Sequence, residues 1–293
     1  MSSIVVFGAK GLLGASLVPL LTSLGHTVLT QSRNEGADLC LDPNNREAVL
    51  DLFTSIQPDA VINLVAATNV DQCETQPNLA WLANANVVKV LTECIASVRS
   101  RFGTLAHLVH ISTDQVYDGL GPHSEDDVNL VNVYALTKYM GELFSERIGA
   151  TVLRTNFVGR SRCSLRTSFS DWLIESFKNQ TPITVFEDIK FSAVHIDTLC
   201  GIIAKCIKNR PIGIFNVGCR DSISKAEFAF ALANALNLSS EQVSLGVSIK
   251  AALKARRPLD MSLQVSRLEH ALGIQLPTMR TEIELVAKEY LND

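Results

Sequence analysis

Short apolar runs alternate with stretches of helical apolar spacing through the first half of the chain. Six apolar runs are typical of strands, at residues 4–7, 26–30, 38–41, 60–64, 106–111 and 151–154. Four stretches with apolar residues every third or fourth position are expected to be helices, at residues 12–24, 45–56, 79–98 and 133–148. This alternation predicts an α/β fold of Rossmann type, a doubly wound parallel sheet with helices on both faces.

The regular alternation weakens after about residue 158. Helices are expected at residues 169–178, 194–208, 224–236, 265–272 and 280–290, and strands at residues 182–186 and 212–217. We therefore predict a dinucleotide-binding domain at residues 1–158, with residues 190–220 returning to it. Residues 159–189 and 221–293 are expected to form a smaller, mixed C-terminal lobe that binds substrate.

Composition and charge narrow the class of partner. With 293 residues, of which 47% are hydrophobic and 19% charged, the chain can bury a sizeable core. A net charge of −4 and the lack of a basic arm argue against nucleic acid, so small molecules are the expected partners. No uncharged apolar run is long enough to predict a membrane span. Seven cysteines without a C-x-x-C pair favour reduced thiols and a cytoplasmic location.

A glycine-rich turn stands between the first predicted strand and the first predicted helix. Its pattern is G-x-x-G-x-x-G, in which glycines allow a tight turn and a close approach of the backbone to a pyrophosphate. The helix N-terminus that follows offers free N–H groups and a positive dipole to the phosphates. We expect dinucleotide binding here, by Gly8, Lys10, Gly11, Leu12, Leu13 and Gly14.

The residues after the second strand bear on the choice of cofactor. Ser32 and Arg33 stand where an acidic residue would favour NAD, and a guanidinium can bind a 2′-phosphate through two hydrogen bonds. NADP is therefore the expected cofactor, although NAD stays open and Arg33 could equally be a solvated loop residue. Asp42, after the third strand, is expected to face the adenine, and Leu64, at the end of the fourth strand, to line the cofactor.

Tyr134 and Lys138 lie four residues apart, and therefore on one face of a predicted helix. A free tyrosine has a pKa of about 10, and a neighbouring cation is expected to lower it enough for acid–base chemistry. Thr113 ends the preceding strand at the carboxyl edge of the sheet, where α/β proteins carry their sites. The three are the candidate catalytic group, although a turn hydroxyl is an alternative role for Thr113.

Several longer motifs resemble the extended short-chain dehydrogenase/reductase superfamily, and within it the dTDP-4-dehydrorhamnose reductase family. The segment Ser112-Thr-Asp-Gln-Val-Tyr-Asp-Gly119 is similar to that family's S-T-D-x-V-[FY]-x-G signature. Similar stretches are Asn63-Leu-Val-Ala-Ala-Thr-Asn-Val-Asp-Gln-Cys-Glu74, Arg154-Thr-Asn-Phe-Val158, Arg257-Pro-Leu-Asp-Met-Ser-Leu263 and Leu272-Gly-Ile-Gln-Leu-Pro277. The resemblance runs nearly from end to end.

The resemblance implies hydride transfer from NADPH to a 4-keto sugar nucleotide, with Thr113, Tyr134 and Lys138 as the catalytic group. It also implies a cofactor wall of Ala66 and Ala67, and a substrate site made of Thr68, Asn69, Val70, Gln115, Phe157 and Arg257. Gln115 and Phe157 replace residues that are usually or often aromatic in the family, so the sugar and base are left open. Ser16 stands where some members carry a glutamate that binds a bridging metal, so no metal is expected.

Three functions stay open at this point. The first is a reductase of a 4-keto-6-deoxy sugar nucleotide in polysaccharide assembly, and the second is an epimerase or dehydratase of the same superfamily. The third is a non-catalytic subunit, similar to the regulatory subunit of methionine adenosyltransferase. A homodimer is compatible with each of them.

Overall fold

The computed structural model describes residues 1–33, 36–103, 106–164 and 166–291. A central sheet of seven strands has the order β11-β6-β5-β4-β1-β2-β3, and every pair in it is parallel. Its strands are β1 Ser3–Phe7, β2 Thr27–Ser32, β3 Leu39–Cys40, β4 Ala60–Asn63, β5 His107–Ile111, β6 Thr151–Thr155 and β11 Gly213–Val217. The strand order reverses between β1 and β4, which confirms the predicted doubly wound fold.

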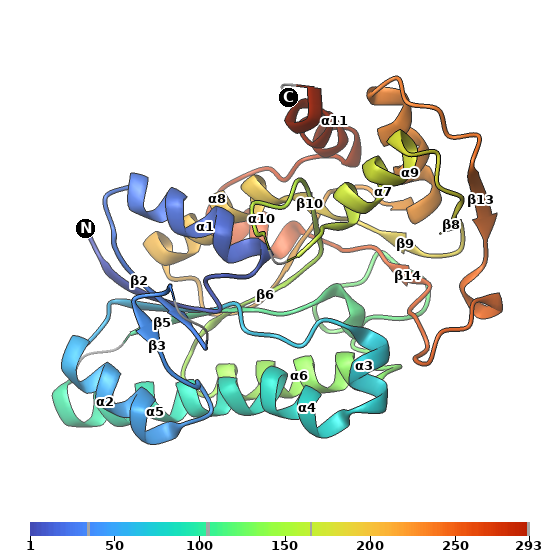
Figure 1. Ribbon diagram of the computed structural model, residues 1–293. Helices are drawn as coiled ribbons and strands as arrows, with labels where there is room; N and C mark the ends of the chain where they lie inside the picture. Colours follow the sequence, from blue (N-terminus) through green and yellow to red (C-terminus); the bar gives the residue numbers. More distant parts are fainter. Residues whose placement is uncertain (34–35, 104–105, 165, 292–293) are drawn as a thin grey trace.

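Helices cover both faces of the sheet (Figure 1). One layer holds α1 Leu12–Ser23, α8 Ile196–Asn209 and α10 Ser266–Leu272, and the other holds α2 Arg46–Ile56, α5 Val87–Phe102 and α6 Val133–Glu146. Successive side chains of β1 point to opposite faces. Ile4 and Val6 therefore pack with Leu17 of α1, whereas Val5 and Phe7 belong to the core beneath α2 and α5.

One long helical segment lies beside α6. It consists of α4 Pro77–Trp81, the π-helical turn η1 Leu82–Asn86 and α5. Among the described residues, Pro77–Phe102 is the one helix whose length and composition would suit a membrane span, although it is not an uncharged run, since it contains Lys89 and Glu93. Of that apolar window 56% is buried within the protein, as in a helix that packs against a sheet. A cytoplasmic location stays a prediction.

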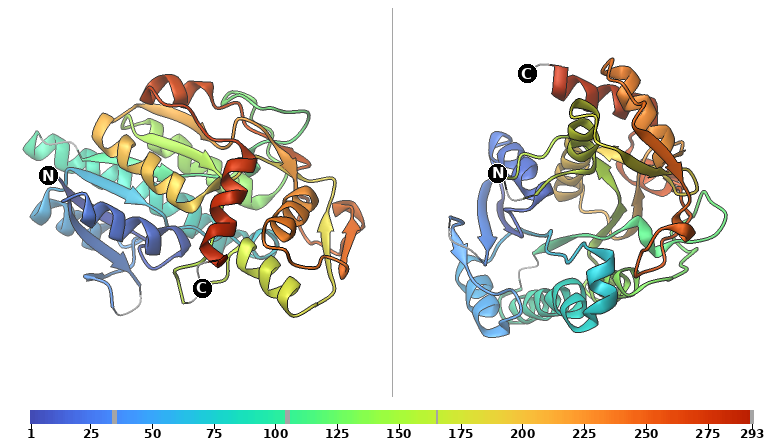
Figure 2. Two further views of the ribbon diagram at one scale, coloured as in Figure 1. Left: turned by 90° about the horizontal axis from the view of Figure 1, so that it is seen from above. Right: turned by 45° about the vertical axis from the view of Figure 1, so that its right-hand side comes forward.

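The remaining elements build a smaller lobe at the end of the sheet far from the N-terminus (Figure 2). Its helices are α7 Phe169–Lys178, α9 Lys225–Ala235 and α11 Met279–Leu291. Its strands pair as β8 Ile183–Phe186 with β13 Val243–Gly246, and as β9 Lys190–Phe191 with β12 Ile223–Ser224 and β14 Asp260–Met261. Short connecting elements are α3 Val70–Thr75, η2 Asp114–Val116, β7 Phe157–Val158, β10 Val194–His195 and η3 Ser248–Lys250.

Two details differ from the sequence-based expectation. The helix expected at residues 194–208 begins only at Ile196, because β10 pairs with β7 and His195 caps α8 by accepting a hydrogen bond from the Asp197 amide. Residues 190–220 are also divided, since β9 pairs within the lobe while β11 joins the main sheet beside β6. The domain division at residues 158, 189 and 220 stays a prediction.

Candidate active site

A cavity of about 500 Å³ opens at the carboxyl ends of the central strands, where the strand order reverses. Ligands bind at this place in doubly wound sheets. Most of the residues singled out from the sequence line it, namely Gly8, Lys10, Gly11, Leu12, Leu13, Gly14, Ser32, Arg33, Leu64, Ala66, Thr68, Thr113, Gln115, Tyr134, Lys138 and Phe157. Segments far apart in the sequence therefore meet around one space.

The glycine turn has the geometry that a pyrophosphate requires. Gly8 has a φ of 78°, and a Cβ at this position would lie 3.0 Å from the Val65 amide nitrogen. A Cβ on Gly14 would lie only 2.3 Å from the Ala9 carbonyl oxygen. Gly11 is the N-cap of α1 and provides no side-chain hydrogen bond to the helix, whose first residues, Leu12 to Gly14, line the cavity. These features fit a bound dinucleotide.

The catalytic candidates meet at the inner wall of the cavity. Tyr134 and Lys138 come from α6, and Thr113 follows β5. The Lys138 ammonium donates a hydrogen bond of 2.6 Å to the Ile111 carbonyl, and burial lowers its pKa to about 8. Burial also raises the pKa of Tyr134, although a hydrogen bond with Thr113 opposes the shift. The net direction is opposite to the lowering expected from the sequence, because burial dominates, and the phenol is protonated at neutral pH.

A buried charge network fixes α6 behind these residues. Glu142, one turn after Lys138, forms an ion pair of 2.6 Å with Arg154 of β6, and both side chains are at most 1% exposed. Ser112 donates a short hydrogen bond to Glu142, and Arg154 donates to the Tyr117 hydroxyl at 2.7 Å. The network joins α6 to β5 and β6, so it holds the helix face that carries the candidate catalytic pair.

Four expected binding residues lie outside the cavity lining. Asp42 accepts hydrogen bonds from the backbone and side chain of Asn44, so its carboxylate serves a turn after β3. The Ala67 amide donates to Asn84 at 2.8 Å. Asn69 caps α3, and Val70 packs in the cluster that contains Tyr134. Their proposed contacts with cofactor or substrate receive no support from the cavity.

A second cavity of about 310 Å³ adjoins the first. The two share Gln115, Asn156 and Phe169 as lining residues. Arg257 lines the second cavity and forms an ion pair of 3.0 Å with Asp71. The other lining residues are mainly apolar and come from the lobe, namely Trp172, Thr184, Val185, Phe186, Ile189, Lys225, Leu253, Pro258 and Met261. The site therefore extends from the sheet into the lobe.

Some lining residues were missed from the sequence. Gln31 of β2 accepts from the Gly8 amide at 3.2 Å and donates to the Leu41 carbonyl at 2.6 Å, so it supports the glycine turn. Its position at the end of an apolar strand was an available signal. Asn156, which donates to Asp114 at 2.9 Å, lies within the Arg154–Val158 motif. For Lys225 and Arg166, no neighbouring sequence motif indicates a place in a cavity wall.

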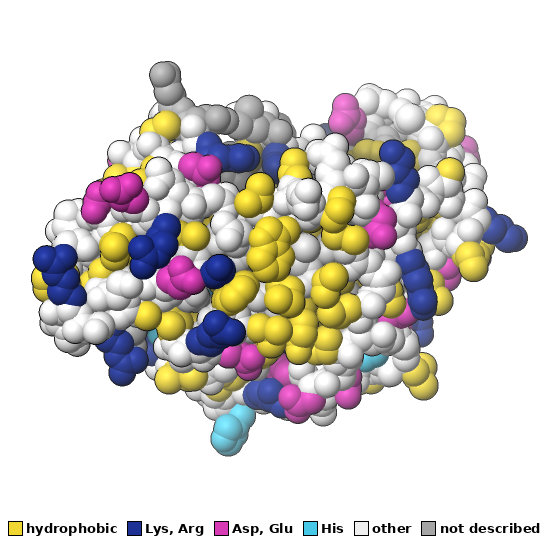
Figure 3. Space-filling view, turned by 90° about the horizontal axis from the view of Figure 1, so that it is seen from below, with side chains coloured by type: hydrophobic (Ala, Val, Ile, Leu, Met, Phe, Trp, Pro, Cys, Tyr) yellow, Lys and Arg dark blue, Asp and Glu magenta, His cyan; other side chains and the backbone are white. Residues whose placement is uncertain are grey.

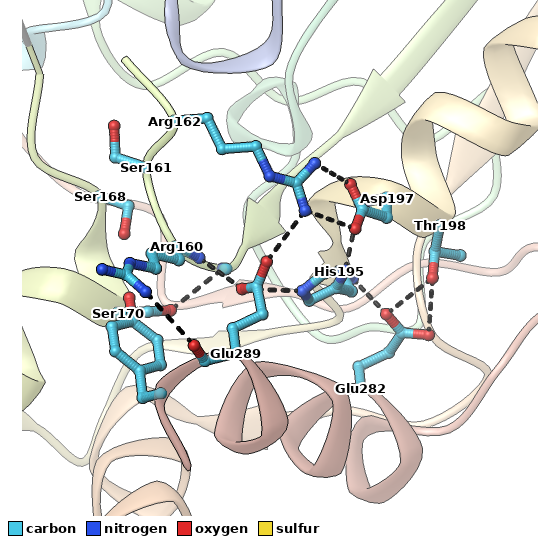
Figure 4. A network of polar contacts seen from close by, with 12 residues as sticks. Arg160, Ser161, Arg162, Ser168, Ser170, His195, Asp197, Thr198, Glu282 and Glu289 are labelled. Carbon is cyan, nitrogen blue, oxygen red and sulfur yellow. Dashed lines mark hydrogen bonds and ion pairs between the residues drawn. The ribbon is translucent and has the colours of Figure 1, made fainter. Parts of the chain in front are cut away.

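The loop after β7 forms one side of the cavity. Its Arg166 donates to the Thr68 hydroxyl at 3.3 Å, and the Cys163 thiol donates to the Lys10 carbonyl at 3.0 Å. Figure 4 shows how the start of this loop is held. Arg162 pairs with Asp197 at 2.5 Å and with Glu289 of α11 at 3.2 Å. The C-terminal helix therefore positions a wall of the cavity.

The same network contains the one group among the described residues that could hold a metal ion. His195, Asp197 and Glu289 offer ligand atoms that lie within 4.8 Å of one another. The guanidinium of Arg162 is hydrogen-bonded to both carboxylates, with distances of 2.5 and 2.7 Å to Asp197. A fixed cation of the protein therefore already balances these charges.

A model of the RmlD substrate binding domain family matches residues 1–292 of the chain. The chain belongs to this family. The resemblance drawn from the motifs is thereby confirmed. Among curated relatives, the dTDP-4-dehydrorhamnose reductase of Shigella flexneri is 26% identical, over 98% of this chain and 97% of the relative. The spore coat polysaccharide biosynthesis protein SpsK of Bacillus subtilis is 28% identical, over 100% and 98%.

Solved structures of the RmlD family have the same fold. The dTDP-4-dehydrorhamnose reductase of Bacillus anthracis, in complex with NADP, has a TM-score of 0.88 and 26% identity, and the match covers 98% of this chain and 99% of that one. The corresponding reductase of Clostridium acetobutylicum also has a TM-score of 0.88 and 26% identity, with 99% and 100% covered. A UDP-glucose 4-epimerase of Thermotoga maritima, at 17% identity and a TM-score of 0.81, is similar in fold alone.

Proposed function

We propose that this protein uses NADPH to reduce the 4-keto group of a 4-keto-6-deoxy sugar nucleotide in the assembly of a polysaccharide. The observation that carries the proposal is the pair of adjoining cavities. The first combines the glycine turn with Thr113 and Tyr134, and the second is apolar with cationic side chains at its wall. A cofactor in the first and a nucleotide in the second would place the sugar at the shared wall.

The proposed roles of the cavity residues follow from their chemistry. When bound, NADPH supplies the hydride. The glycine turn and the N-terminus of α1 hold its pyrophosphate, and Arg33 with Ser32 holds the 2′-phosphate. NAD stays open as an alternative cofactor. Arg33 is exposed, and the one charged partner proposed for it is the 2′-phosphate, which NAD lacks.

The proton comes from the protein. Tyr134 is protonated at neutral pH because burial raises its pKa, so it can donate a proton to the oxygen of the former ketone. Thr113 donates a hydrogen bond to the same oxygen and places it beside the phenol. Lys138 acts as a cation that compensates the phenolate and holds the ribose of the cofactor. Gln115 and Phe157 line the place of the sugar.

A reductase is favoured over a sugar-nucleotide dehydratase because of Gln115. Removal of water from the sugar needs a second acid–base pair besides Tyr134, and a glutamine side chain neither gives nor takes a proton at neutral pH. Asp114 alone remains, and burial raises its pKa to about 6 while it accepts a hydrogen bond from Asn156. A non-catalytic subunit is disfavoured because Thr113, Tyr134 and Lys138 all line one cavity.

The reductase and its alternatives give different products. Purified protein is incubated with NADPH and dTDP-4-keto-6-deoxyhexose, and separately with NADP⁺ and dTDP-glucose, and sugar and cofactor are followed by mass and absorbance. We expect one NADPH oxidised for each 4-keto group lost, and no reaction of dTDP-glucose. A 4-keto-6-deoxy product formed from dTDP-glucose without net cofactor change would instead indicate a dehydratase. No reaction in either mixture, or with the UDP equivalents, would favour the non-catalytic alternative.

We also propose that the protein forms a homodimer through the face that carries α4 and α6. Hydrophobic side chains gather on this face of the molecule (Figure 3). Trp81, Leu82, Leu136 and Leu143 are each at least 36% exposed, and Trp81 packs edge to face on Phe144. An apolar patch of this kind is typical of a protein interface. Sedimentation of wild type and Leu136→Glu tests it, and a wild type that sediments as a monomer would contradict it.

A further inference from the structure

Lys225 is a cation in the wall of the second cavity, and no carboxylate of the described residues forms an ion pair with it. It is the first residue of α9, and its side chain reaches the cavity beside Asn156 and Phe169. Its ammonium lies 4.6 Å from the centre of the Phe169 ring and 4.3 Å from that of Phe191. Within the described parts of the chain, no oxygen accepts a hydrogen bond from this ammonium.

The charges near Lys225 are already engaged elsewhere. Asp114 interacts with Lys225 electrostatically, but it accepts a hydrogen bond from the Asn156 side chain at 2.9 Å. Arg257, the other cation of this cavity, is paired with Asp71. Lys225 is only partly exposed, and burial lowers the pKa of its ammonium. A buried charge is stable when an opposite charge lies against it.

We infer that Lys225 binds the diphosphate of the sugar-nucleotide substrate. The assignment rests on the proposed function for the identity of the substrate. Lys225 lines the second cavity beside Gln115, Asn156 and Phe169, which also line the first, and it interacts electrostatically with Asp114, the residue after Thr113. In a hexose nucleotide the diphosphate is attached at C1, across the sugar ring from the C4 carbon that reacts. A ketone held by Thr113 and Tyr134 would therefore direct its diphosphate toward Lys225.

The two aromatic rings determine how Lys225 can act. The Phe169 and Phe191 rings both lie against the ammonium, and Lys225 lines the second cavity. A lysine recognises phosphate as a point charge, without the two-pronged geometry of arginine. The contact would therefore contribute affinity for any nucleoside diphosphate, while the base is selected by the apolar part of the cavity.

Binding measurements test the inference without turnover. Isothermal titration with dTDP, UDP, GDP and ADP, each at saturating NADP⁺, identifies the nucleotide that wild type binds best. The corresponding nucleoside and UDP-glucuronate serve as further ligands. The variants are Lys225→Met, Lys225→Gln and Lys225→Arg. The matched control is Lys190→Met. Lys190 lies on β9, where it pairs with Ser224 of β12, and its side chain is exposed and lines neither cavity.

We expect Lys225→Met and Lys225→Gln to bind the nucleoside diphosphate roughly 10- to 100-fold more weakly. Nucleoside and NADP⁺ affinity should be unchanged, Lys225→Arg should stay within about threefold of wild type, and Lys190→Met should match it. Lys225→Gln serves as the neutral variant if Lys225→Met does not fold, and unchanged NADP⁺ affinity reports the fold.

Three results would overturn the inference. The first is diphosphate binding by both neutral variants within twofold of wild type, and the second is a wild type that binds none of the four nucleoside diphosphates. The third is a loss confined to UDP-glucuronate with UDP unaffected, because the charge would then serve a carboxylate on the sugar. If the expected binding pattern is seen but no ketone is reduced, the reductase proposal fails while this assignment stands.

Discussion

Replacing Gly14 with alanine is expected to separate the glycine turn from α1. The new Cβ would lie 2.3 Å from the carbonyl oxygen of Ala9, 2.5 Å from its carbonyl carbon and 2.7 Å from its Cα. All three atoms belong to the backbone, so no change of rotamer can remove the overlap. Restoring a separation of 3.0 Å requires the helix and the turn to move apart by about 0.7 Å.

The structure gives both the sign and the size of the effect. Forcing a methyl group into a packed interior costs about 1–3 kcal/mol. An alanine in an open helical position is about 0.5–1 kcal/mol more stable than glycine. Gly201 of α8 provides that matched control, because a Cβ there meets no atom within 4 Å. We expect Gly14→Ala to lower the free energy of unfolding and Gly201→Ala to raise it.

Two assays on the same variants test this reasoning. Urea unfolding gives the stability of each protein, and fluorescence titration gives its affinity for NADPH. Gly14→Ala should bind NADPH at least 10-fold more weakly, because the displaced N–H groups no longer reach the pyrophosphate. Gly201→Ala should bind normally. If Gly14→Ala matches wild type in both stability and NADPH affinity, the described geometry of the turn is wrong.

Three further predictions concern charged residues. Arg33→Ala should remove a preference for NADPH over NADH of about 10- to 150-fold; equal affinities in wild type would show that Arg33 is a solvated residue. The pKa of Lys138 is lowered from 10.5 to about 8, so NADPH affinity should fall as pH rises through about 8. The unfolded chain binds more protons between these values, so stability should rise across that window, and both effects should vanish in Lys138→Met. Glu142→Gln leaves the buried Arg154 without its counter-charge and should cost about 3–5 kcal/mol by urea unfolding; a loss below about 1 kcal/mol would contradict this.

Elements with a strong local signal could be predicted from the sequence. The apolar run of β1 predicts a strand, and the glycines that follow it predict a tight turn. Both predictions depend only on residues that are neighbours in the sequence. The pair Tyr134 and Lys138 needs only helical spacing to face the same cavity. The pairing of β13 with β8, by contrast, depends on segments about 60 residues apart, and strands such as β9 and β10 are too short to show a period.

The site was predicted less completely, because burial and charge depend on tertiary packing. Lys225 follows a capping serine and reads as an ordinary helix start, and only the packing of α9 beside Phe169 and Phe191 brings it to the cavity. The pKa of Tyr134 was expected to fall because the sequence shows a nearby cation but not the burial that opposes it. The sequence shows that residue 42 is an aspartate, but not that its carboxylate accepts hydrogen bonds from the backbone and side chain of Asn44.

The central claim is that the Tyr134 hydroxyl donates the proton in ketone reduction. The most direct measurement is single-turnover oxidation of NADPH by a 4-keto-6-deoxy sugar nucleotide in wild type, Tyr134→Phe and Tyr139→Phe. Tyr139 is the matched control, because it lies on the same helix but outside the lining of both cavities. We predict a rate roughly 10²- to 10⁴-fold lower for Tyr134→Phe with NADPH affinity retained, and a normal rate for Tyr139→Phe. A Tyr134→Phe variant that keeps more than about a tenth of the wild-type rate would contradict the account.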